Sequence, residues 1–99
     1  MSEFFGIFLD YETQTPSSVQ LADANELAEM IKTGVVAEDV IETLKIEPGK
    51  VTILLSHHPL ANLVISGVKE VTQKWMKQRA RRQVRIEIKG AEAEIPYPA

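Results

Sequence analysis

The first apolar stretch of the chain has the composition of a strand. Residues 3–11 (EFFGIFLDY) are rich in aromatic and β-branched residues, which strands favour. Successive side chains of a strand point to opposite faces. On this pattern the two faces carry Phe5, Ile7 and Leu9 on one side and Phe4 and Phe8 on the other. Apolar residues on both faces predict an inner strand that is covered on both sides, or covered by a partner.

A polar segment and then a helical pattern follow. Residues 11–20, with Pro16 and a serine pair, predict a loop that is the most mobile segment of the chain. The next residues, ADANELAEMIKTG, predict a helix with a cap at Asp23, Glu26 three residues later as in a capping box, and Gly34 as the stop. Its expected buried stripe consists of Leu27, Ile31 and either Ala24 or Met30.

The middle of the chain predicts a second helix and a second strand. Residues 35–50 (VVAEDVIETLKIEPGK) favour a short helix that ends in a turn at residues 47–49. Its inward side chains are expected to be Val36, Val40, Ile41 and Leu44. Residues 51–56 (VTILLS) are almost continuously apolar, which predicts a central strand.

The second half predicts a long helix and a hairpin. Pro59 suits the first position of a helix that runs to about Ala80. The apolar stripe of this helix is Ala61, Val64, Val68, Val71 and Trp75. Residues 83–89 (QVRIEIK) alternate strictly, with Val84, Ile86 and Ile88 inward and Arg85, Glu87 and Lys89 outward. A turn at Gly90-Ala91 then leads into EAEI.

These elements predict one compact α/β domain over residues 1–99. The expected order is β-α-α-β-α-β-β, with a small mixed sheet of about four strands. Because helices connect most of the strands, we expect a mainly parallel sheet with a C-terminal antiparallel hairpin.

Composition narrows the class of protein. With 44% hydrophobic and 25% charged residues in 99, the chain has the balance of a soluble globular domain. It has no cysteine, which excludes disulfides, thiolate zinc sites and cysteine nucleophiles and is typical of a reducing compartment. The first residues lack the basic region of a signal peptide, and no apolar run is long enough to span a bilayer. We therefore expect a cytoplasmic protein with no membrane contact.

The two halves of the chain differ in charge. Residues 1–50 carry ten acids and three lysines, whereas residues 51–99 carry four acids and eight bases. The candidate partner-binding basic face on the long helix and the following strand comprises Lys69, Lys74, Lys77, Arg81, Arg82 and Arg85. Three interpretations remain open: cations that complement the helix dipole and the acidic half, a nucleic-acid-binding face, or contact with an acidic protein surface. The pI of about 5.3 disfavours nucleic acid.

Two adjacent histidines raise the question of a pocket. His57 and His58 follow the second strand, and Asp10 ends the first, so the three form a candidate pocket near strand ends and a helix start. The favoured interpretation is a strand-to-helix junction, because neighbouring side chains rarely chelate one ion and neither HExxH nor a nucleophile elbow is present. We predict no catalytic residue, no metal and no cofactor.

One resemblance concerns residues 65–95, ISGVKEVTQKWMKQRARRQVRIEIKGAEAEI. An apolar helix, a tryptophan, a basic helix end and an alternating hairpin resemble the C-terminal half of the effector-associated constant component family. These are small bacterial proteins linked to conflict and defence systems. The residues that carry the match are Trp75, Arg79, Arg81, Arg82, Val84, Ile86 and Ile88. The resemblance implies a non-enzymatic adaptor that works beside a separate effector.

The sequence therefore favours a non-enzymatic protein–protein interaction module, acting alone or as an oligomer, in a bacterial defence or signalling system. Its partner would be another protein, such as an effector, or a second copy. The alternatives are a nucleic-acid-binding protein that uses the basic face, and a small enzyme or metal protein centred on His57 and His58.

Overall fold

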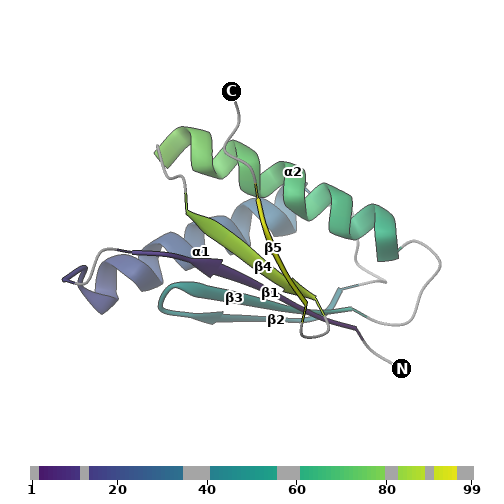
Figure 1. Ribbon diagram of the computed structural model, residues 1–99, viewed down its shortest axis with the longest axis horizontal. Coiled ribbons are helices and arrows are strands. Elements are labelled where there is room, and N and C mark those ends of the chain that lie inside the picture. The colour runs from purple at the N-terminus through teal and green to yellow at the C-terminus, as the bar shows by residue number, and fades with distance from the viewer. Residues whose placement is uncertain are drawn as a thin grey trace.

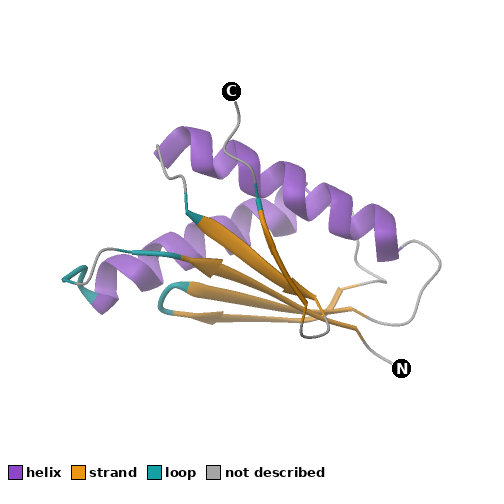
Figure 2. Cartoon of the chain, in the orientation of Figure 1, coloured by secondary structure: helices purple, strands orange, loops and turns teal. Residues whose placement is uncertain are grey.

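The computed structural model describes residues 3–11, 14–34, 41–55, 61–79, 83–88 and 91–95, to which all structural statements refer. The elements in chain order are β1 (Glu3–Leu9), α1 (Ser17–Gly34), β2 (Ile41–Glu47), β3 (Lys50–Leu55), α2 (Ala61–Arg79), β4 (Val84–Ile88) and β5 (Ala91–Glu94) (Figure 1). The five strands form one sheet in the order β2-β3-β1-β4-β5 (Figure 2). The predicted α/β class is confirmed.

Every neighbouring strand pair is antiparallel, so the prediction of a mainly parallel sheet is wrong. That prediction treated residues 41–47 as part of a helix. They form β2 instead, and the turn from β2 to β3 reverses the chain, so β3 runs antiparallel to β1. β1 and β2 do run in the same direction, but β3 lies between them; β3 and β4 are likewise separated by β1. This split β-α-β arrangement is that of ferredoxin-like folds, and β5 extends it at the β4 edge.

The predicted second helix over residues 35–50 is also wrong. Residues 41–47 form β2, and residues 35–40 lie outside the described part of the chain. Apolar and polar residues alternate in TLKIE (residues 43–47), which is the period of a strand, and Leu44 and Ile46 pack against the core. In so short a segment, the spacing of a few apolar residues also fits a helix. The pairing with β3 stabilises the strand instead.

A tight turn joins β2 to β3. Glu47 pairs with Lys50, so Pro48 and Gly49 form the connection. Gly49 has a φ of 73°, a left-handed conformation that glycine adopts without steric cost. Its amide donates to the carbonyl of Gln20 (3.3 Å), and its carbonyl accepts from the amide of Leu9 (2.8 Å). The turn therefore ties the hairpin to β1 and to α1.

Helix α1 begins six residues before the predicted cap at Asp23. The amides of Val19 and Gln20 donate to the carbonyl of Pro16, and the helix starts at Ser17. Residues 17–20, predicted to belong to a mobile loop, are therefore the first turn of the helix. The predicted buried stripe is confirmed: Ala24, Leu27 and Ile31 are all buried.

Helix α2 and the C-terminal hairpin match the prediction closely. Val64, Val68, Val71 and Trp75 of the predicted α2 stripe are buried. In the hairpin, Val84 and Ile86 are buried and Ile88 pairs with Ala91. Ala91, predicted to be a turn residue, is therefore the first residue of β5.

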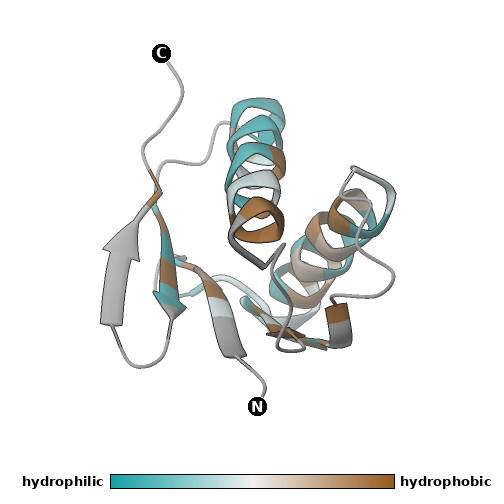
Figure 3. Cartoon of the chain, turned by 90° about the vertical axis from the view of Figure 1, so that its right-hand side faces the viewer, coloured by the Kyte–Doolittle hydropathy of each residue, from teal (hydrophilic) through white to brown (hydrophobic). Residues whose placement is uncertain are grey.

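Both helices lie on the same side of the sheet (Figure 3). The core fills the space between this layer and the sheet, and Ile7, Val51, Ile53 and Ile86 contribute to it from the strands. Burial alternates along β3, where every second side chain is buried. The other face of the sheet, called the open face below, is not covered by any described element.

Candidate functional site

The strand register places the side chains of the open face in rows. One row runs Glu47, Lys50, Phe8 and Arg85 across β2, β3, β1 and β4. The next row runs Lys45, Thr52, Gly6 and Glu87 across the same strands. These are the residues that alternate with the buried ones, so the strands that build the core also determine this surface.

Phe8 lies at the centre of the first row. It is half-buried, with Lys50 Nζ 4.9 Å and Arg85 Cζ 5.1 Å from the centre of its ring. Both distances are within the range of a cation–π interaction. Leu54, two residues beyond Thr52 on β3, adds a second half-buried apolar side chain to the open face. Apolar surface at the centre is thus flanked by cations on both neighbouring strands.

Charge pairs surround this centre. Arg85 Nε lies 3.5 Å from Asp10 Oδ2, and Lys45 Nζ lies 3.6 Å from Glu47 Oε1. All four side chains are at least 38% exposed, so solvent screens these pairs and each contributes little to stability. Their charges remain accessible to a binding partner.

The predicted basic face is divided by the structure. Lys69, Lys74 and Lys77 are exposed on α2, but Glu70 is exposed between them. Arg85 belongs instead to the open face of the sheet, on the side away from the helices. Arg81 and Arg82 lie outside the described residues. The described part of the helix face is therefore three lysines interrupted by an acid.

Arg79 links the two helices. Its guanidinium donates two hydrogen bonds to the Glu26 carboxylate, one of them from Nε to Oε1 at 2.7 Å. These bonds lower the pKa of Glu26 from its ordinary value of 4.5, against the opposite effect of burial, and raise the pKa of Arg79. Trp75 Nε1–H also acts to lower the pKa of Glu26, although this buried group has no hydrogen-bond partner within normal hydrogen-bond distance.

A second contact beside this pair joins the end of β1 to α1. The hydroxyl of Tyr11 donates to Asp23 Oδ2 at 2.7 Å. The sequence predicts a helix cap for Asp23 and Glu26 and reveals neither contact. No local signal marks them, since Arg79 and Glu26 are 53 residues apart. Arg79–Glu26 and Arg85–Asp10 each join the basic half to the acidic half, as the charge asymmetry suggested.

Of the candidate pocket of Asp10, His57 and His58, only Asp10 lies among the described residues. Leu55, the last described residue before the histidines, pairs with Glu3 at the start of β1. Asp10 follows the other end of β1, seven residues along, which corresponds to roughly 24 Å of extended strand. The histidines themselves lie outside the described residues.

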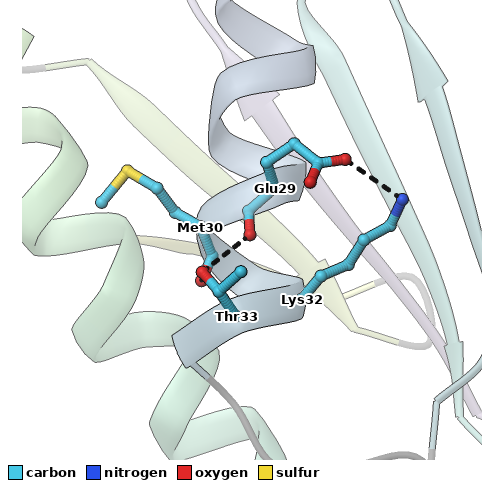
Figure 4. Close-up of polar contacts among 4 residues, drawn as sticks. All are labelled: Glu29, Met30, Lys32 and Thr33. Atoms are coloured by element: carbon cyan, nitrogen blue, oxygen red, sulfur yellow. Dashed lines mark hydrogen bonds and ion pairs between the residues drawn. The ribbon is translucent and has the colours of Figure 1, made fainter.

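A shallow groove lies between the helices on the outer side. Its volume is about 260 Å³, and its lining residues are Met30, Thr33, Gly34, Gly67, Glu70, Val71 and Lys74. Met30 extends from α1 towards α2, whereas Thr33 Oγ1 donates back to the carbonyls of Glu29 (3.0 Å) and Met30 (3.3 Å) (Figure 4). Lys32 Nζ pairs with Glu29 Oε1 at 3.4 Å and points away from the groove (Figure 4). The volume is below the usual range of small-molecule sites.

Two properties of the described residues concern metal sites and membrane spans. These residues contain no cluster of three or more histidine, aspartate or glutamate side chains able to hold a metal ion. Neither described helix has the length and apolar character needed to cross a membrane. The open face, with its central aromatic ring and surrounding charges, is the best-defined candidate surface.

Comparisons with known proteins returned no match to a family model, a curated protein or a solved structure. The resemblance to effector-associated constant components therefore stays a prediction.

Proposed function

We propose that the chain is a non-enzymatic protein–protein interaction module that binds through the open face of its sheet. The observation that carries the proposal is Phe8, a half-buried aromatic side chain at the centre of a sheet face that no described helix covers. The sequence predicted that β1 is covered on two sides or by a partner. Both helices pack on one side of the sheet, so a partner would cover the other side.

The composition of the open face favours a protein rather than a nucleic acid. Among its described side chains, the cations Lys45, Lys50 and Arg85 are matched by the acids Asp10, Glu47 and Glu87. A nucleic-acid surface needs an excess of cations to neutralise phosphates. A partly apolar centre surrounded by charges of both signs resembles the core and rim of a protein interface.

The same proposal includes the cellular compartment and the type of system in which the module works. A cytoplasmic adaptor in a bacterial defence or signalling system agrees with the absence of cysteine and with the resemblance of residues 65–95. The partner is then a protein such as an effector, or a second copy of the chain.

Site-specific photocrosslinking tests the proposal. Phe8 is replaced by p-benzoylphenylalanine, which preserves an aromatic ring at the centre of the open face, and the chain is irradiated in its native host. A matched variant carries the same probe in place of Lys69, which is exposed on α2. We expect discrete protein adducts from position 8 and none from position 69.

Two outcomes contradict the proposal. Adducts from position 69 alone would mean that the partner contacts the predicted basic face of α2 and not the open face. Absence of adducts from both positions would show that neither surface is in protein contact.

A further inference from the structure

The charges of the open face are complementary across a line that runs midway between β3 and β1. In the first row, Glu47 on β2 and Arg85 on β4 are at equal distances from this line and have opposite charges. In the next row, Lys45 on β2 and Glu87 on β4 are also at equal distances and opposite in charge. The acid of the pair is on β2 in the first row and on β4 in the next row. In each row, therefore, the two charges on either side of the line are opposite.

The centre of the face follows the same relation. Lys50 on β3 and Phe8 on β1 lie in the first row on either side of the line, and Thr52 and Gly6 do so in the next. A cation on one side thus corresponds to an aromatic ring on the other. Such a combination gives a favourable contact when the two positions are brought together.

We infer that the protein which covers the open face is a second copy of this chain, related by a two-fold axis that runs along the strands midway between β3 and β1. This inference rests on the proposed function of the open face. The axis places β3 of one copy over β1 of the other. Lys45 then meets Glu87 of the second copy, Glu47 meets its Arg85, and Lys50 meets its Phe8. Because the interface is isologous, each contact occurs twice.

Charge selects this axis over a neighbouring one. An axis centred on β1 would place Lys50 opposite Arg85 of the second copy, and like charges would face each other twice at the centre of the interface. An axis half a strand spacing away, between β3 and β1, removes this repulsion and pairs opposite charges in both rows. Sheets that pack face to face keep their strands within about 30° of each other, which is compatible with such a placement.

Charge reversal on the two outer strands tests the inference. Lys45 and Glu87 are separated in one chain by three strand spacings, roughly 14 Å, so they make no direct pair within a copy. Lys45→Glu alone, or Glu87→Lys alone, places like charges opposite each other at both copies of the contact. We expect each variant to raise the dimer dissociation constant by roughly tenfold or more.

Mixing the two variants provides the decisive measurement. In a dimer of one Lys45→Glu chain and one Glu87→Lys chain, both contacts again pair opposite charges. Analytical ultracentrifugation should therefore show a dimer for the wild type, weakened association for each variant alone, and restored association for the equimolar mixture. Lys69→Glu on α2 is the matched control and should sediment as the wild type does. Circular dichroism verifies that all variants are folded.

The results separate this inference from the proposed function. A wild type that stays monomeric at every concentration, or a mixture that does not regain association, overturns the two-fold pairing. If crosslinks from position 8 then join the chain to a protein of another mass, the proposed function holds with a different partner. If position 8 gives no crosslink at all, both are overturned.

Discussion

Two adjacent residues of β1 provide a direct test of the two faces of the sheet. Ile7 is fully buried between Val51 and Ile86 in the register, whereas Phe8 points to the open face. Ile7→Ala leaves a cavity in the core and should cost about 2 to 5 kcal/mol of unfolding free energy. Phe8→Ala removes two cation–π contacts at a half-exposed position and should cost only about 1 to 2 kcal/mol.

These magnitudes are large enough to be distinguished. A domain of this size unfolds with a free energy of roughly 5 to 15 kcal/mol, so Ile7→Ala removes a substantial part of it. Each kcal/mol lowers the melting temperature by about 4 to 8 °C at this chain length. Thermal unfolding followed by circular dichroism in dilute solution, where association is minimal, measures both variants under the same conditions.

Protein concentration extends the test. A chain that associates through its open face is stabilised by mass action, so the melting temperature of the wild type should rise with concentration. Phe8→Ala should lose this rise, whereas Ile7→Ala should keep it from a lower starting value. If Phe8→Ala were as destabilising as Ile7→Ala in dilute solution, Phe8 would be part of a core, and its assignment to an open face would be wrong.

Three further predictions concern the helices and the turn. Trp75→Ala should lower the free energy of unfolding by about 3 to 5 kcal/mol, because the side chain is fully buried. Trp75→Phe should cost clearly less, as measured by urea unfolding. Equal costs of the two variants would argue against dense packing around Trp75. Gly49→Ala should lower the free energy of unfolding by about 1 to 2 kcal/mol, because the φ of 73° at this position is left-handed. Gly49→Asn should cost less in the same urea unfolding experiment. An unchanged stability of Gly49→Ala would contradict this turn conformation. Since the folded pKa of Glu26 is lowered, its pairing with Arg79 stabilises the fold above pH 4.5 and this contribution is lost as the pH falls through the folded pKa. Glu26→Gln should therefore be less stable than the wild type near neutral pH and equal to it in strong acid; a difference that persists in acid would point to a packing effect instead.

Regular local patterns were predictable from the sequence. The apolar stripe of α2 and the strict alternation of β4 each extend over enough residues to define one period, and their buried residues are confirmed. Residues 41–47 are different because the segment is short and allows both a helical and a strand reading. Its pairing with β3 is a tertiary contact that overrides local preference.

The sheet order and the polar contacts depend on contacts between distant residues. A helix over residues 41–47 would leave no strand to reverse the chain before β3, so the expectation of a mainly parallel sheet fails once β2 is present. Both crossovers also skip one strand position. Closeness in sequence groups Arg85 with Lys69 in one basic face, yet Arg85 lies on a strand whose alternation turns it to the open face. For Phe8, alternation alone predicted that it lies on the face opposite Ile7 and Leu9, and the structure shows which of these faces is the core.

The central claim is that a protein covers the open face of the sheet. Hydroxyl-radical footprinting tests it most directly by comparing the chain in intact native cells with the purified chain in dilute solution. Leu63, which is 67% exposed on α2, serves as the internal reference. We expect oxidation of Phe8 and Leu54 to fall in cells relative to that of Leu63. Equal relative oxidation of these residues in both conditions would contradict it.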